Sequence, residues 1–370
     1  MIIFSSHRSV VNGKEYDWRG EFLKETLQNN KKDFIFIRHS MDGNLKSIVF
    51  KYKKGKLVSN ENLKVFSKIS VIRYISETLL TVLFIIINEN GKDYVYIGIN
   101  PLNALTGIIL RKLKKVKKVI FYTPDYSPIR FKNKLLNKIY HIIDSFCVNN
   151  SDEVWNVSTR IYDVRAKMGL SKNKNKILPN IPSEEYKEFI ENKKNKFRLV
   201  TLGKIGDQLD FINIFEAIKN LKNKYPKLTM EIIGNGPEEN KYKELAKKMG
   251  LKNQIIFTGY LDHKKALKEI SKSGIGLALY NGKWEFNYYG DSVKCREFFS
   301  FGLPVISTNT HSTVEDIKKF RAGIICKINA KEYQEALNNI FNNYEYYSHN
   351  SKKIHDKYKS VDLDLLDKLW

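Results

Sequence analysis

Cysteine is scarce in this chain, with only Cys147, Cys295 and Cys326 among 370 residues. No Cys-x-x-Cys pair is present, and three cysteines do not make a disulfide framework, so we expect buried and reduced thiols. Histidines with metal-ligand spacing are also missing. The single Asp-x-Asp, residues 362–364, falls in a terminal amphipathic stretch. The sequence therefore predicts no metal site.

Long apolar runs are absent as well. The longest, residues 78–87, is much shorter than the roughly 20 residues that a membrane-spanning helix needs. The first residues, Met-Ile-Ile-Phe-Ser-Ser, lack the basic segment and cleavage site of a signal peptide. We therefore expect a cytoplasmic protein without a spanning helix.

Negative charge is in deficit: 40 Asp and Glu face 64 Lys and Arg, which gives a formal net charge of +24. Such an excess indicates an anionic partner, for which nucleic acid, anionic lipid and a nucleotide sugar are candidates. The basic run at 111–118 suggests peripheral association with an anionic membrane surface, on the inner face of the cell membrane. No zinc-finger, ribonucleoprotein or dimeric helix-turn-helix pattern is present, so no nucleic-acid partner is expected, although a basic nucleic-acid-binding protein is the alternative hypothesis.

The pattern of apolar residues predicts an α/β fold in two domains, since 370 residues with 42% hydrophobic content can form two cores. The first half alternates predicted strands and helices, with strands at 2–5, 33–38, 94–99, 119–122 and 152–157, a hairpin at 48–58, and helices at 20–27, 69–87, 104–113 and 134–149. A charged run at 183–196 predicts a linker. We assign domains to 1–182 and 183–350, followed by a terminal helix at 351–370.

Two predicted loops of the first domain carry candidate catalytic side chains. Ligands bind at the carboxyl ends of strands in open α/β sheets. The loop at 6–18 holds His7 and Asp17, and the loop after the strand at 119–122 holds Asp125 between two prolines. Asp125 is our candidate general base, His7 and Asp17 are its rivals, and the alternative is that Asp125 is only a turn residue.

Residues 285–308 form the most informative segment. Asp291 or Ser292 can cap a helix that Gly302 ends, and an apolar strand follows Pro304. Lys294 and Glu297 then share one helix face, while Cys295, Phe298 and Phe299 turn toward a core. A helix N-terminus with a nearby lysine binds phosphate, and a glutamate one turn on can accept from ribose hydroxyls. The alternative is an ordinary solvated ion pair.

Lys294, the run Glu-Phe-Phe-Ser-Phe-Gly from Glu297 and the run Leu-Pro-Val-Ile-Ser-Thr at 303–308 resemble the signature of the large retaining family 4 of GT-B glycosyltransferases, the glycosyl transferases group 1. The resemblance covers residues 197–308 and includes, in order, Gly203-Lys204, Gly-Asn-Gly-Pro at 234–237, Phe-Thr-Gly-Tyr at 257–260 and Ala-Leu-Tyr at 278–280. The chain departs from the family where Tyr289 replaces a glutamate, where Lys204 replaces an arginine, and where Gln208 is the polar residue nearest to a missing second basic residue.

The resemblance implies two Rossmann-like domains that face each other across a cleft, with a C-terminal helix that crosses back to the first domain. It further implies a metal-independent hexosyltransferase that uses no cofactor, takes a UDP- or GDP-linked sugar as substrate, and acts on a saccharide or lipid-linked saccharide in surface glycan biosynthesis. A GT-B epimerase or phosphorylase is the alternative. The implied donor-binding residues are Gly203 and Lys204 for the diphosphate, Gly236, Pro237, Tyr260 and Leu261 for the base, Glu297 for the ribose, and Lys294 with Asp291 and Ser292 at the start of the phosphate-binding helix.

Overall fold

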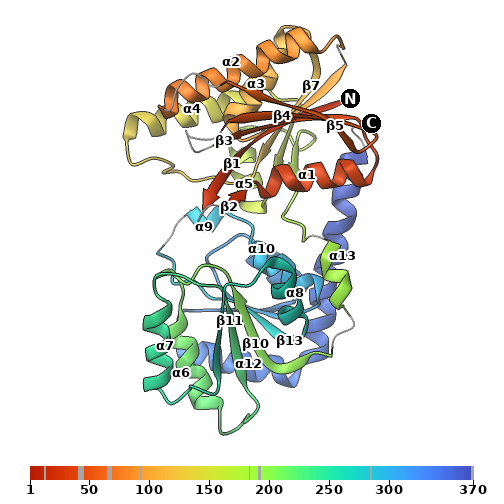
Figure 1. Cartoon of the computed structure of the whole chain (residues 1–370). Coiled ribbons are helices and arrows are strands. Elements are labelled where there is room, and N and C mark those ends of the chain that lie inside the picture. The colour runs from red at the N-terminus through yellow and green to blue at the C-terminus, as the bar shows by residue number, and fades with distance from the viewer. Residues whose placement is uncertain are drawn as a thin grey trace. The chain divides into compact units, whose positions relative to one another are not determined.

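The computed structural model describes residues 1–11, 14–40, 46–64, 69–91, 93–182, 184–190, 193–283 and 286–367. The chain divides into two compact units, shown in Figure 1, of which the first is Met1–Leu178 together with Leu365–Trp370 and the second is Pro179–Asp364. The division therefore falls after Leu178, slightly earlier than the expected boundary after Pro182. Each unit is an α/β domain with its own sheet and core.

The first unit is built on a mainly parallel sheet with the strand order β5-β4-β3-β1-β6-β7-β8-β9. Only β4 and β5, and the short β2 beside β1, run antiparallel to their neighbours in the described part of this unit. Its elements are β1 (Ile2–Val11), β2 (Lys14–Tyr16), α1 (Trp18–Asn29), β3 (Phe34–Ser40), β4 (Ser47–Lys53), β5 (Lys56–Leu63), α2 (Ser70–Asn88), β6 (Tyr94–Ile99), α3 (Pro101–Lys112), β7 (Val116–Thr123), α4 (Lys134–Asn150), β8 (Glu153–Asn156), α5 (Thr159–Lys167) and β9 (Asn175–Ile177). The predicted strands, hairpin and helices of this half are confirmed, apart from the first loop.

Alternation of side chains along the strands gives this sheet two buried faces. On β1, Ile3 packs with α2, α3 and α4, whereas Ile2 and Phe4 pack with Leu23 and Leu27 of α1. Figure 1 shows α1 on one side of the sheet and α2, α3 and α4 on the other. Both faces are covered, as parallel sheets require.

The expected loop at 6–18 is wrong, because β1 continues to Val11 and pairs with β2, with Ser9 opposite Tyr16. Pairing of β1 with β3 also extends to Arg8 opposite Ser40. The apolar pattern that predicts the strand stops at Phe4. The backbone pairing continues because the following Ser5 and Ser6 are buried with polar partners, Tyr96 and Asp17, rather than with apolar ones.

The second unit has an entirely parallel sheet with the strand order β12-β11-β10-β13-β14-β15. Its elements are the 3-10 helix η1 (Glu184–Phe189), β10 (Asn195–Leu202), α6 (Phe211–Leu221), β11 (Thr229–Ile233), α7 (Glu239–Lys248), β12 (Ile255–Gly259), α8 (His263–Ser271), β13 (Ser273–Ala278), α9 (Phe286–Tyr289), α10 (Val293–Ser300), β14 (Val305–Thr308), α11 (Val314–Phe320), β15 (Gly323–Cys326), α12 (Ala330–Asn342) and α13 (Tyr344–Asp367). Helices α6, α7 and α12 pack on one face of the sheet, and α8, α10, α11 and α13 pack on the other.

Two segments of this unit differ from the expected linker and terminal helix. The charged run at 183–196 includes η1, whose Tyr186 is buried, stacks edge-on against Phe301 at 6.0 Å and bonds to His355 of α13 at 2.9 Å. Helix α13 begins at Tyr344 instead of 351, and its residues from Leu365 on are grouped with the first unit. Charge alone suggested a linker, but one tyrosine with apolar neighbours is enough to anchor the segment.

Candidate functional site

The glycine-rich loops that follow β10 and β11 are held against each other by their backbones. Gly203 N donates to Ile233 O at 2.9 Å, and Ile205 N donates to Asn235 O at 2.9 Å. A Cβ on Gly234 would lie 2.1 Å from the Gly203 carbonyl oxygen, and one on Gly236 would lie 2.1 Å from that of Ile205. Only glycine permits this approach, and Gly203 and Gly234 also have positive φ angles of 119° and 129°. These glycines shape the loops at the carboxyl end of the sheet.

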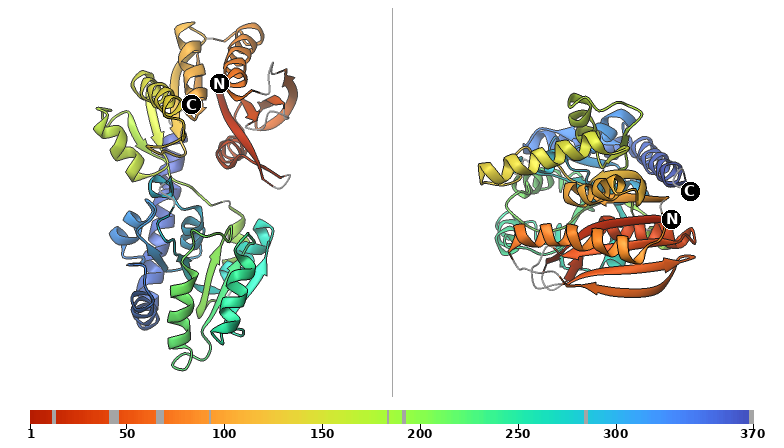
Figure 2. Two further views of the ribbon diagram at one scale, coloured as in Figure 1. Left: turned by 90° about the vertical axis from the view of Figure 1, so that its left-hand side faces the viewer. Right: turned by 90° about the horizontal axis from the view of Figure 1, so that it is seen from above.

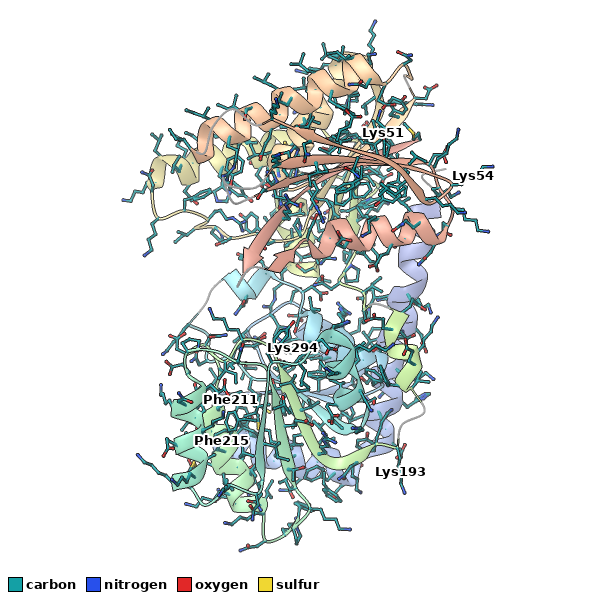
Figure 3. All side chains as sticks on the ribbon, viewed as in Figure 1. Lys51, Lys54, Lys193, Phe211, Phe215 and Lys294 are labelled. Carbon is teal, nitrogen blue, oxygen red and sulfur yellow. The ribbon has the colours of Figure 1, made fainter. Side chains whose placement is uncertain are left out.

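Lys294 projects from the first turn of α10 toward these loops. A Cβ on Gly203 would lie 3.8 Å from Lys294 Nζ, and the same ammonium lies 4.9 Å from the centre of the Tyr280 ring. Figure 3 labels Lys294 at the strand end of the second unit. Gly203 and Lys294, which the sequence analysis predicts to bind the donor, therefore lie close together. Tyr280, which follows β13, had no predicted role. Its ring attracts the Lys294 ammonium through a cation–π contact, which helps to hold the lysine in place.

The N-terminus of α10 is organised as the sequence suggested. Ser292 is the N-cap and accepts from Cys295 N at 3.4 Å, and Gly302, with a φ of 64°, follows the last turn. Cys295, Phe298 and Phe299 are fully buried. The orphan N–H groups of the first turn therefore lie next to Lys294, and this combination suits a phosphate group.

Asp291 is occupied within the fold. Its carboxylate accepts from Arg296, from Thr313 Oγ1 at 2.8 Å and from Asn180 N at 2.8 Å. Burial disfavours its charge, but the charge and hydrogen bonds of Arg296 outweigh that effect and lower the pKa of Asp291. Arg296 also bonds Asp316 of α11 at 2.7 Å. Asp291 thus fixes the start of α10 and has little capacity left for a ligand.

Glu297 is nearly buried and is paired with a histidine that sequence reasoning missed. His263 Nε2 lies 2.9 Å from Glu297 Oε1, and His263 Nδ1 lies 3.0 Å from Glu185 Oε2 of η1. The two carboxylates, led by the hydrogen bond to Glu297, outweigh burial and raise the pKa of His263 to about 9. The imidazolium therefore holds one oxygen of Glu297. The sequence does give one indication that His263 lies near the site: it is the first residue of α8, directly after the predicted Gly-Tyr turn.

We expect replacement of His263 by Gln to destabilise the protein at neutral pH and to have no effect near pH 10. A histidine whose pKa rises on folding from 6.5 to about 9 contributes stability that is fully present below pH 6.5 and is lost as the pH rises through 9. Because about a third of the side chain is exposed, we expect roughly 1 kcal/mol. Urea unfolding of both proteins between pH 6 and 10 measures it. His349→Gln on α13 is the control, and a difference that persists unchanged to pH 10 would contradict the charged pair.

The remaining predicted donor residues line the same strand ends and are open to solvent. Lys204, Pro237 and Tyr260 are exposed, with Tyr260 exposed by 54%, while Leu261 packs partly against the core. Gln208 Nε2 bonds the Lys204 carbonyl at 3.4 Å, so it braces the loop that carries Lys204. The second unit therefore gathers two lysines, a helix N-terminus and a His–Glu pair at the carboxyl edge of one parallel sheet.

In the first unit, His7 lies on β1 and both of its ring nitrogens have partners. Nε2 lies 3.1 Å from Glu77 Oε2 of α2, and Nδ1 lies 3.0 Å from Asn103 Nδ2 of α3. Since the amide donates and the carboxylate accepts, Nδ1 is the acceptor and Nε2 carries the proton. Its side chain is only 7% exposed. His7 therefore lies in a buried polar cluster, with a partner at each ring nitrogen.

Asp17 is the N-cap of α1. Its carboxylate accepts from Gly20 N at 3.0 Å and from Ser6 Oγ. Burial raises the pKa of Asp17, although these hydrogen bonds partly offset the rise. The geometry gives Asp17 a structural role in positioning α1.

Asp125 lies in the loop after β7 and is more open than its rivals. Its side chain is 42% exposed, and Oδ2 accepts from Arg130 Nη1 at 2.6 Å. Burial disfavours the charge of Arg130, but Asp125 and nearby tyrosines, one of them Tyr74 of α2, outweigh it and raise the pKa of Arg130. Tyr74 also stacks edge-on against His7.

Within the described ranges, no group of three His, Cys, Asp or Glu side chains is arranged to hold a metal ion. In the same part of the chain, no helix is both long enough and apolar enough to cross a membrane.

Comparison with known proteins agrees with this architecture. Residues 182–356 match the family model described as "Glycosyl transferases group 1". The chain is 27% identical over 156 residues to an uncharacterized glycosyltransferase of Methanocaldococcus jannaschii, a match that covers 40% of this chain and 36% of the relative, so it spans about a third of that relative's length.

Two solved structures are similar over the whole chain. One is Anabaena HepE in complex with UDP, with a TM-score of 0.68 at 12% identity, covering 100% of this chain and 99% of that one. The other is the lipopolysaccharide outer core galactosyltransferase WaaB, with a TM-score of 0.66 at 14% identity and 100% coverage of both chains. Both likenesses show the fold. With the two Rossmann-like units, they give this chain the GT-B fold, and its second unit is similar to the glycosyl transferases group 1.

Proposed function

We propose that the protein transfers a sugar from a nucleoside-diphosphate sugar to a hydroxyl of a saccharide or lipid-linked saccharide in surface glycan biosynthesis. The observation that carries this proposal is the position of Lys294 Nζ beside Gly203, at the N-terminus of α10. Departure of a nucleoside diphosphate develops negative charge, and fixed donors and cations aimed at that charge lower the barrier. Neither nucleic-acid binding nor GT-B epimerase or phosphorylase chemistry is favoured by the relatives.

The donor side of this proposal assigns a role to each residue group. Lys294, Lys204 and the first turn of α10 after Ser292 bind the diphosphate. Glu297, oriented by His263, accepts from the ribose hydroxyls, because a carboxylate held by a cation on one oxygen can offer the other. The base lies against Tyr260, Leu261, Gly236 and Pro237. UDP is the preferred nucleotide, supported by the UDP complex of Anabaena HepE, with GDP as the alternative.

The acceptor side rests on the first unit. Asp125 is proposed as the general base that takes the proton of the acceptor hydroxyl, since its carboxylate is partly exposed whereas His7 and Asp17 are committed to partners inside the fold. A lipid-linked saccharide as acceptor is supported by the likeness to WaaB, a galactosyltransferase of the lipopolysaccharide outer core. With such an acceptor, we propose that the enzyme acts in the cytoplasm, peripheral on the inner face of the membrane.

A thermal-shift panel of UDP, GDP, ADP and CDP, with a single-stranded oligonucleotide as comparison, tests the proposal. A ligand at ten times its Kd stabilises the folded state by about 1.4 kcal/mol, which is readily measured. We expect one nucleoside diphosphate, UDP first, to raise Tm selectively. A rise with the oligonucleotide and none with any nucleotide would overturn the proposal.

We expect activity to be independent of divalent metal. Two lysines and a helix N-terminus supply the positive charge that a metal ion supplies in other transferases. Initial rates measured with and without excess EDTA should agree within about twofold, which is much less than the contribution of a catalytic metal. Loss of activity in EDTA with recovery on addition of Mg²⁺ or Mn²⁺ would refute this expectation.

A further inference from the structure

Helices α2 and α4 of the first unit have an unusual distribution of side chains. The inner side of α2 buries the polar Arg73, Ser76 and Glu77 together with the apolar Val82, Phe84 and Ile85, and the inner side of α4 buries Asp144, in an ion pair with Arg165, beside Cys147 and Val148. Their outer sides carry large apolar residues that are 38% to 71% exposed: Ile72, Ile75, Leu79, Leu83 and Ile87 on α2, and Leu135, Leu136, Ile139, Ile142 and Phe146 on α4. An ordinary surface helix carries charged and polar residues on its outer side instead.

These side chains form one surface, here called the outer apolar face. On each helix they recur every three or four residues, apart from the adjacent Leu135 and Leu136, which puts them on a single stripe. Helix α3 packs against both α2 and α4, and the right-hand view in Figure 2 shows the three helices side by side over the sheet. Elsewhere in the described chain, exposed apolar residues such as Ile212 and Ile256 are scattered. Exposed apolar side chains gathered on neighbouring helices in this way mark an interaction site.

Positive charge surrounds the outer apolar face. Lys112 and Lys114 at the end of α3, and Lys132, Lys134 and Lys138 at the start of α4, are exposed, and Lys112 Nζ lies 5.9 Å from the centre of the Phe146 ring. The acidic residues of the two helices, Glu77 and Asp144, are both buried. The apolar face thus has exposed lysines at the end of α3 and at the start of α4, and no exposed carboxylate among the described side chains of α2 or α4.

The basic run at 111–118 contributes fewer exposed cations to this surface than the sequence suggested. Arg111 bonds Asp152 at 2.6 Å, Lys118 bonds Glu153 at 2.6 Å, and Lys115 Nζ donates to the carbonyls of Ile86 and Glu89 at 3.2 Å. About half of that run is therefore used inside the fold. Of the exposed cations in this run, Lys112 lies beside Phe146 of the outer apolar face.

We propose that the outer apolar face docks on an anionic lipid bilayer, with α2 and α4 lying in the plane of the interface. Apolar side chains at the acyl boundary and lysines at the headgroups are the combination that holds interfacial helices on membranes. A second copy of the chain is a poorer occupant, because an isologous contact would bring the lysines of both copies together. The proposal rests on the proposed function, since it brings the first unit to the membrane that holds a lipid-linked acceptor.

Vesicle co-sedimentation of the full chain tests the surface. The probes are phosphatidylcholine vesicles with and without phosphatidylglycerol, at low and high salt. We expect binding to the anionic vesicles only, weakened by salt. The variant Leu79→Gln/Leu83→Gln/Ile142→Gln and the variant Lys134→Gln/Lys138→Gln should each lower the partition coefficient at least tenfold. The matched control, Ile212→Gln/Ile256→Gln in the second unit, should bind like the wild type.

Two further measurements separate the possible outcomes. Each variant should keep the wild-type Tm shift with UDP, because the substituted residues lie outside the donor site. Absence of that shift in the wild type would defeat the proposed function and leave vesicle binding as a separate result. Vesicle binding that the apolar variant retains would overturn the proposal, as would a wild-type dimer in light scattering that the apolar variant converts to monomer.

Discussion

Replacing Asp125 by Asn is expected to lower kcat by about 10²- to 10⁴-fold, the usual contribution of a general base. Asparagine preserves the shape of the side chain but cannot accept the proton of the acceptor hydroxyl. Nucleotide affinity should stay unchanged, because the residues proposed to bind the donor lie in the second unit. The measurements are kcat at saturating substrates, the Kd for UDP and the Tm.

The same substitution distinguishes catalysis from a structural ion pair. Asp125 bonds Arg130 at 2.6 Å, and a purely structural role predicts a modest loss of Tm with near-normal turnover. The control is Asp163→Asn on the exposed side of α5, which should behave like the wild type. If Asp125→Asn keeps more than about a tenth of wild-type kcat, the assignment fails, because that loss lies below the general-base range.

Replacing Lys294 or Glu297 by Ala is expected to weaken nucleotide binding by about 10- to 150-fold, since loss of one charge-assisted hydrogen bond costs about 1.5 to 3 kcal/mol. Turnover should fall as well if Lys294 stabilises the departing diphosphate. Lys294 Nζ lies at the Gly203 loop on the surface of the site, so the fold should survive its removal. Titration calorimetry with UDP and steady-state kinetics measure both effects.

Lys318→Ala on the exposed side of α11 is the matched control for charge, because it lowers the net charge equally without touching the site. Glu297→Ala also releases His263, so it should shift the pH dependence of stability in the same direction as His263→Gln. Unchanged UDP affinity in both variants would remove Lys294 and Glu297 from the donor site.

Local signals were sufficient for the segment that carries the donor helix. A serine cap, a left-handed glycine and apolar spacing all act within a few residues of one another, and Ser292, Gly302 and Phe298 have the predicted roles. Gly203 and Lys294 are far apart in the sequence, and local signals could not place them in one site. That prediction came from the family resemblance, which carries information about how related chains fold. The role of Asp291 could not be predicted from its neighbours in the sequence, because its partner Asn180 lies far away along the chain.

By itself, the sequence determined the α/β class, the order of most strands and helices, and the αβ unit around α10, because these depend on periodicity and on hydrogen bonds between near neighbours. The tertiary structure alone decided which polar side chains meet. It paired Glu297 with His263, committed His7 to Glu77 and Asn103, and extended β1 beyond its apolar residues. It also decided that the Ile and Leu stripe of α2 faces outward, since an apolar helical stripe has the same spacing whether it packs on a sheet or lies open to a membrane.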